Sequence, residues 1–216
     1  MSGASIESEQ WLSAFRRLEW VPATYAVKAS DEGATVLLYA IDEALLCGHE
    51  YVGSEHLFAG AVRTSAAVVR SLGRLVPIRE VIAEALRVSN RLVEITPADQ
   101  IIICGKREDP QDLVWQRVQA AVAHQDMFPL TPRAERNIAD AQALARQFGN
   151  GRFGAEEVVA AVSRDGGAVE KALTAFGSAR EEAATFMLRR REWGSLLRLA
   201  DESSDTPPQG LAGVDR

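Results

Sequence analysis

Apolar residues recur at helical spacing along most of the chain. They stand at positions 37, 40, 41, 44 and 45 in one segment and at 134, 138, 141, 145 and 148 in another, three or four residues apart. Most segments are rich in Ala, Leu, Glu, Arg and Gln, which lose little side-chain entropy in a helix. The pattern predicts an all-α protein.

These two segments are copies of one another. Residues 30–63 align without a gap on residues 131–164, each position shifted by 101. A repeat of this kind indicates one supersecondary unit that is used twice. The identical pairs include Ala40 and Ala141, Ala44 and Ala145, Gly48 and Gly149, Gly53 and Gly154, Glu55 and Glu156, and Arg63 and Arg164.

Each copy carries the signals of four successive helices. A hydroxyl residue, Ser30 or Thr131, caps the first helix, and a glycine, Gly48 or Gly149, follows its end. The second helix is expected to begin at position 54 in the first copy and at 155 in the second. The third is expected to end at 72 or 176, and the fourth to cover residues 78–88 or 179–199. Because a unit of about 60 residues has a thin core, we expect the two units to pack face to face about a pseudo-twofold axis, with a cleft between them.

The pattern divides the chain into a repeat domain with three additions. Residues 29–199 form the double repeat, with repeat 1 at 29–88, an insertion at 89–129 and repeat 2 at 130–199. Residues 1–28 are expected to be a helical N-terminal extension. Residues 200–216, polar and rich in Pro and Gly, are expected to be a disordered tail.

The two longer additions contain features that favour packing onto the repeats. Residues 109–125 carry a helical stripe, and β-branched runs at 92–95 and 101–104 suggest a short hairpin. Tryptophan buries a large area, so we expect the N-terminal extension and the insertion to be ordered. The four tryptophans, all outside the aligned stretches, are Trp11, Trp20, Trp115 and Trp193, and the stripe consists of Leu113, Val118, Ala121 and Val122.

Charge and composition restrict the classes of partner that the chain can bind and the location that we expect for it. The chain has 24 basic and 30 acidic residues and a formal net charge of -6, which argues against nucleic acid or an anionic membrane as the main partner. No basic segment precedes an apolar run near the N-terminus, and no apolar stretch approaches the ~20 residues of a membrane span, so a cytoplasmic location is expected. Cys47 and Cys104 are too isolated for a disulfide framework, and Cys47 is interpreted as an inert core thiol.

Two short sequences connect the repeat to a known family. GHEYVGSEHLFAG at residues 48–60 and LTPRAERNI at residues 130–138, together with the repeat, resemble the N-terminal domain of the Clp family of AAA+ unfoldases. The first motif is nearly intact, whereas the second keeps its glycines and first glutamate but has lost its histidines. No GxxxxGK[ST] phosphate loop occurs in the sequence, so the chain resembles a free-standing Clp receptor domain without the ATPase modules.

The resemblance implies a ligand site. In several Clp N-terminal domains the glutamates that match Glu55 and Glu156 receive the guanidinium of phosphorylated arginine. Ser30 and Thr131 match the Thr that initiates the first helix of the motif, where a hydroxyl and backbone amides can donate hydrogen bonds to a phosphate. The alternative interpretation is that the glutamates only stabilise a first helical turn and the hydroxyls only cap a helix.

Other chemistry is weakly indicated. His49 and His56 flank a turn, but their spacing is not that of a helical zinc site, no cysteine partner stands nearby, and in the resembling family these histidines are structural. We therefore expect no metal site. We also find no residue constellation that specifies catalysis and expect no cofactor.

The leading hypothesis is a non-enzymatic binding protein that modulates Clp-dependent proteolysis. Its expected partners are Clp unfoldase or protease components, adaptors, substrate peptides or phosphoarginine-type ligands. One alternative is a decoy that sequesters cyclic-peptide antibiotics directed at the Clp unfoldase. Another is a dimerising scaffold without a ligand pocket.

Overall fold

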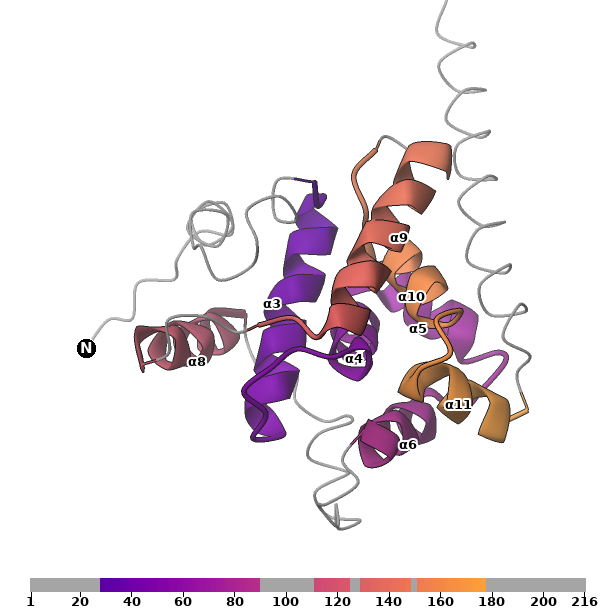
Figure 1. Ribbon diagram of the computed structural model, residues 1–216, viewed down its shortest axis with the longest axis horizontal. Helices are drawn as coiled ribbons and strands as arrows, with labels where there is room; N and C mark the ends of the chain where they lie inside the picture. The colour runs from indigo at the N-terminus through magenta and orange to yellow at the C-terminus, as the bar shows by residue number, and fades with distance from the viewer. Residues whose placement is uncertain (1–27, 90–110, 125–128, 149–150, 178–216) are drawn as a thin grey trace, which may run out of the picture.

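The computed structural model describes residues 28–89, 111–124, 129–148 and 151–177 (Figure 1). Within these ranges the chain forms eight α-helices and no β-strand, which confirms the predicted all-α class. The helices are α3 (Asp31–Leu46), α4 (Ser54–Thr64), α5 (Ala66–Leu72), α6 (Ile78–Ser89), α8 (Gln111–His124), α9 (Pro132–Phe148), α10 (Ala155–Val162) and α11 (Ala168–Ala175).

Local capping explains where the helices begin and end. The Oγ atom of Ser30 accepts a hydrogen bond of 3.0 Å from the Gly33 amide and so caps α3. Thr131 caps α9 in the same way, with Pro132 as the first helical residue. Gly48 has a φ of 69°, the left-handed conformation predicted for the end of the first helix. Gly149 lies outside the described residues.

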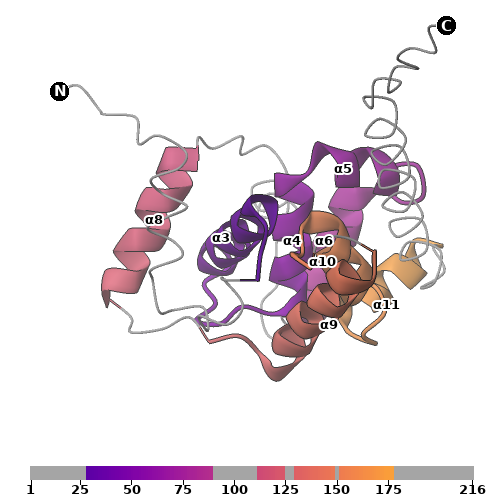
Figure 2. The ribbon, with the colours of Figure 1, turned by 90° about the horizontal axis from the view of Figure 1, so that it is seen from above.

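The core lies where two helix pairs meet. α3 packs on α4, α9 packs on α10, and α4 also contacts α10. Figures 1 and 2 show α8 beside α3, on the side away from α9. The largest fully buried side chains are Trp115, Phe58, Phe153, Leu37, Leu38, Ile41, Leu57, Leu72, Leu86, Ile138 and Leu173.

Short backbone contacts join the two pairs. Ala29 forms an isolated β-bridge with Phe153, and Val52 forms another with Leu130. The offset of 101 converts the first bridge into the second, because it carries Ala29 to Leu130 and Val52 to Phe153. Reciprocal contacts of this kind are what a pseudo-twofold repeat predicts. Superposition of the complete units stays a prediction.

The insertion helix α8 corrects one expectation. Leu113 is predicted to lie in its buried stripe, but it is 42% exposed. The buried face is instead centred on Val114 and Val118, with Trp115 at its edge, and Leu113 lies on the opposite side of the helix. The buried Trp115 confirms that the insertion packs on the repeats. The hairpin, residues 1–27, the helix expected at 179–199 and the tail lie outside the described residues.

The first helix pair is packed more closely than its counterpart. A Cβ atom on Gly60 of α4 would lie 2.5 Å from the carbonyl oxygen of Val36 and 2.8 Å from the amide nitrogen of Ala40, both on α3. The aligned residue in α10 is Ala161. The α9–α10 pair thus accommodates a methyl group at a position where the α3–α4 pair cannot.

We predict that Gly60→Ala lowers the free energy of unfolding by about 2–3 kcal/mol, because the added methyl must push two backbones apart. The matched control is Ala161→Gly, which should cost only about 1 kcal/mol through helix propensity. Urea denaturation of both variants measures the difference. Equal stability of Gly60→Ala and wild type would show that the two helices do not meet at this glycine.

Candidate functional site

The structure places the four predicted site residues at two junctions between the copies. At the first junction, the amide of Ser30 donates a 3.0 Å hydrogen bond to the carbonyl of Phe153, in the loop that leads to Glu156. At the second, the amide of Thr131 donates a 3.0 Å bond to the carbonyl of Val52, in the loop that leads to Glu55. Each of the two hydroxyl residues therefore contacts the loop that precedes the glutamate-bearing helix of the other copy.

Carboxylates of the protein already bind the start of α10 at the first junction. The Ala155 amide donates a 3.3 Å hydrogen bond to Oε2 of Glu32, and the Gly154 amide donates a 2.7 Å bond to Oε2 of Glu157. The hydroxyl of Ser30 donates to the carbonyl of Phe153 at 2.9 Å. A phosphate group at this helix start would have to displace Glu32.

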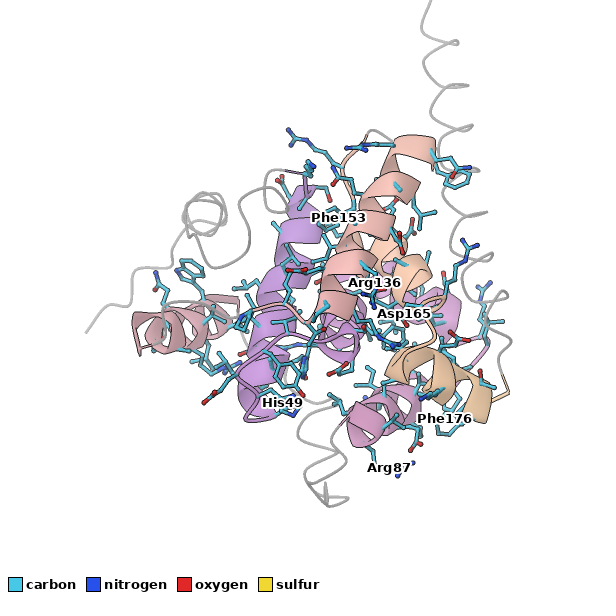
Figure 3. The ribbon with its side chains drawn as sticks, viewed as in Figure 1. His49, Arg87, Arg136, Phe153, Asp165 and Phe176 are labelled. Atoms are coloured by element: carbon cyan, nitrogen blue, oxygen red, sulfur yellow. The ribbon has the colours of Figure 1, made fainter. Side chains whose placement is uncertain are left out.

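The second junction is built from different side chains. Glu55 is only 7% exposed, and its carboxylate lies against Gly53. The Ser54 hydroxyl donates a 3.1 Å hydrogen bond to Oδ2 of Asp165. The side-chain amide of Asn137 donates to Oγ of Ser54 and to Oδ2 of Asp165, each at 2.8 Å. Figure 3 shows Asp165 beside α9 and α11. Glu32 aligns with Arg133, and the residue 101 positions before Asp165, just beyond the aligned stretch, is Thr64, so the two junctions are chemically distinct.

A pair of histidines fixes the turn before α4. The Gly53 amide donates to Nδ1 of His56 at 2.8 Å, so the proton of this buried, neutral imidazole is assigned to Nε2. Nε2 of His56 lies 2.8 Å from Nδ1 of His49. The His49 ring in turn stacks on the Tyr51 ring, with 5.0 Å between the ring centres. Burial, reinforced by His49, lowers the pKa of His56 to about 3. The histidines thus bond across the loop, and Glu157 takes the role of His56 in the second copy.

A cysteine also lies beside these histidines, contrary to the expectation from sequence. The ligand atoms of Cys47, His49 and His56 all lie within 4.8 Å of one another, because the turn at Gly48 folds the chain back. Cys47 is half-buried rather than fully in the core. Thiolate and imidazole are zinc ligands, but His56 presents its protonated nitrogen here, and freeing that nitrogen would break its bond with Gly53. The arrangement favours a hydrogen-bonded turn over a metal centre.

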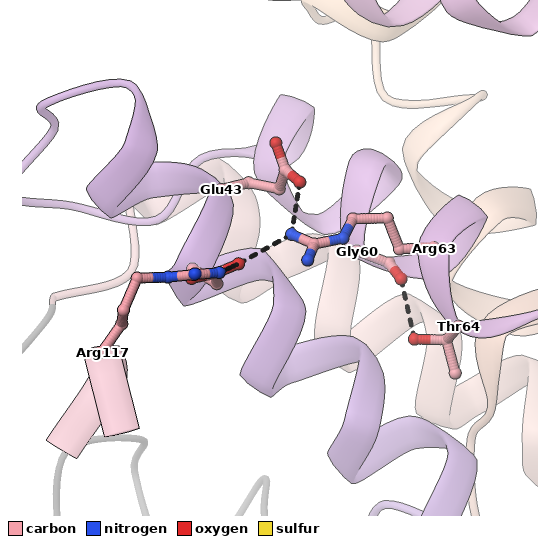
Figure 4. A network of polar contacts seen from close by, with 6 residues as sticks. Glu43, Gly60, Arg63, Thr64 and Arg117 are labelled. Atoms are coloured by element: carbon pink, nitrogen blue, oxygen red, sulfur yellow. Dashed lines mark hydrogen bonds and ion pairs between the residues drawn. The ribbon is translucent and has the colours of Figure 1, made fainter. Parts of the chain in front are cut away.

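A buried ion cluster joins α3, α4 and α8 (Figure 4). Arg117 of α8 binds Asp42 through two hydrogen bonds, from Nε at 2.8 Å and from Nη2 at 2.9 Å. Nη1 of Arg63 bridges Asp42 at 2.8 Å and Glu43 at 2.5 Å, and its guanidinium lies 4.4 Å from the ring centre of Tyr39. Burial raises the pKa of Glu43 to about 7, although Arg63 opposes the shift.

Sequence reasoning missed this cluster. Arg63 stands out in the sequence only as one of the identical pairs, and Arg117 lies 75 residues from Asp42 along the chain. The available signal was the pair of acids, Asp42 and Glu43, beside the apolar stripe, at positions where the second copy has Ala143 and Leu144.

The second copy has a cleft where the first has the ion cluster. Its volume is about 340 Å³, and it lies between α9 and α10. It is lined by Asp140, Ala143, Leu144, Gln147, Ala161 and Arg164, which align with Tyr39, Asp42, Glu43, Leu46, Gly60 and Arg63.

The helical order and the junctions define a Clp N-terminal-domain-like fold. The solved structure of the N-terminal domain of ClpD, a caseinolytic protease associated chaperone from Arabidopsis thaliana, matches this chain with a TM-score of 0.53 and 14% sequence identity. The match covers 76% of this chain and 94% of the ClpD domain, so the chain has the expected fold. No family model matches the sequence. None of the helices in the described ranges is long and apolar enough to cross a membrane.

The buried His56 predicts a pH dependence of stability. Its pKa is about 3 in the folded state, against 6.5 for an unperturbed histidine, so the unfolded chain binds more protons between these values and stability falls as the pH drops below 6.5. The variant His56→Gln keeps a hydrogen-bond acceptor but cannot titrate. When the pH falls from 6.5 to 5, its free energy of unfolding should decrease by about 2 kcal/mol less than that of wild type. Denaturation at both pH values measures this, and identical pH dependence of the two proteins would contradict the buried neutral imidazole.

Proposed function

We propose that this chain is a non-enzymatic Clp N-domain-like binding protein that binds a Clp component, an adaptor or a substrate peptide and thereby modulates Clp-dependent proteolysis. The observation that carries the proposal is the Clp N-terminal-domain fold in a sequence without an ATPase phosphate loop. The same fold forms the N-terminal domain of ClpD, a caseinolytic protease associated chaperone.

The junctions support a protein or peptide ligand over a phosphorylated one. Ser30 and Thr131 lie beside the loops that precede the helices of Glu156 and Glu55, but Glu32 binds the Ala155 amide, which could otherwise donate a hydrogen bond to a phosphate. A second negative charge beside Glu32 would be repelled. We therefore rank peptides and adaptors ahead of free phosphoarginine.

The buried titratable groups support a binding role rather than a catalytic one. Glu43 is held by Arg63, and His56 is held by Gly53 and His49. Both lie inside the helix packing, where a substrate would not reach them without unfolding of the turn or the ion cluster. We assign no catalytic residue and no cofactor to the described residues.

The test is direct binding to the Clp unfoldase of the source organism, measured by biolayer interferometry, with casein degradation by the assembled protease as a second readout. We expect saturable binding and at least a twofold change in the degradation rate. Absence of both effects would overturn the proposal.

A ligand titration separates the candidate ligands. Glu55→Ala combined with Glu156→Ala, checked for folding by circular dichroism, should weaken the interaction if the junctions form the binding surface. Free phosphoarginine should give no saturable heat in calorimetry. A one-to-one isotherm that the double variant abolishes would restore phosphoarginine as the ligand.

A further inference from the structure

Two carboxylates of α3 are almost completely buried where α4 and α8 pack on it. Asp42 is 0% exposed and Glu43 is 1% exposed. Burying a carboxylate is unfavourable unless cations and hydrogen bonds compensate it. The protein supplies two guanidinium groups, one from Arg63 and one from Arg117.

The second copy shows that these acids are not needed to build the helix pair. α9 and α10 pack together with Ala143 and Leu144 at the aligned positions, and they keep Arg164 in place of Arg63. The same place in that pair is a cleft of about 340 Å³. The helix pair therefore forms without acids at these two positions, and the aligned cleft of the second copy is lined by a single acid, Asp140.

The cation that binds Asp42 with two hydrogen bonds comes from outside the repeat. Arg117 belongs to α8, in the insertion, and it approaches Asp42 with two parallel N–H donors, the geometry by which guanidinium groups are recognised. Glu43 adds an independent indication. Its Oε2 atom is buried and has no hydrogen-bond partner, so the acid pair can accept a hydrogen bond from a further N–H donor.

We propose that the acid pair of Asp42 and Glu43 is an arginine-binding site that α8 keeps occupied with Arg117, and that an arginine-bearing segment of a partner protein exchanges with α8 at this site. The inference rests on the proposed binding function and names one of its surfaces. α8 is then an internal ligand, and its Arg117 occupies the site to which the guanidinium group of a partner's arginine would bind. Lysine cannot make two parallel bonds to Asp42, so the site discriminates between the two cations.

The experiment uses Arg117→Ala and the probe N-acetyl-L-argininamide, followed by amide NMR and by thermal unfolding. Wild type should show no saturable shifts, because Arg117 already occupies Asp42. Arg117→Ala should bind the probe with a dissociation constant on the order of millimolar, shift the amides near Asp42 and unfold at a higher temperature when the probe is present. N-acetyl-L-lysinamide should bind at least fivefold more weakly.

Two further variants make the test specific. Adding Asp42→Asn to Arg117→Ala should weaken probe binding at least tenfold. Arg87→Ala removes an arginine from an exposed pair with Glu84 and should behave like wild type. If Arg117→Ala does not fold, Arg117→Lys keeps the charge, and the probe should raise its unfolding temperature.

A folded Arg117→Ala or Arg117→Lys protein that does not respond to the probe would overturn the inference, as would binding that survives Asp42→Asn. In either case Arg117 is only a structural clamp. The experiment contains no Clp component, so its failure leaves the proposed binding function untouched, whereas failure of the unfoldase assay leaves the arginine site intact.

Discussion

The fold depends on a reciprocal backbone connection between its two halves. Ser30 donates to the loop at Phe153, Thr131 donates to the loop at Val52, and each loop donates back, to the carbonyls of Lys28 at 3.3 Å and Pro129 at 3.0 Å. These bonds satisfy the amides and carbonyls that precede a helix, where no intrahelical partner exists. The same bonds set the position of the predicted ligand residues, so the architecture and the candidate site have one cause.

The two halves use one backbone plan for different purposes. In the first, Gly60 lets α4 approach α3 closely, and the insertion helix adds an arginine to a pair of buried acids. In the second, Ala161 stands at the aligned position, the acids are replaced by apolar residues, and a cleft results. A repeat whose copies differ in this way can keep its fold while each copy presents a different surface.

Much of the fold could be predicted because its signals are local. Ser30, Gly48 and Pro132 fix helix ends through capping, a positive φ and a preset φ, and these effects depend only on nearby residues. The repeat offset then predicted which loops belong to which helix starts, although it could not predict that each start would meet the loop of the other copy.

The missed features are long-range. Cys47 approaches His56 only because the chain reverses at the turn, and Arg117 finds Asp42 only because α8 docks beside α3. Leu113 was placed in the wrong face because the rotation of an isolated helix is set by what it packs against, here the face centred on Val114. Composition and spacing carry no information on such encounters between distant segments.

The central claim is that the two helix pairs form one cooperative body through the reciprocal junctions. Native-state hydrogen exchange of the four junction amides, those of Ser30, Phe153, Val52 and Thr131, tests it most directly. The account predicts that all four amides exchange with the same free energy, equal to that of global unfolding. Exchange of the Thr131 and Val52 amides at a much lower free energy than that of the helix cores would show that the halves separate before they unfold, and would contradict the account.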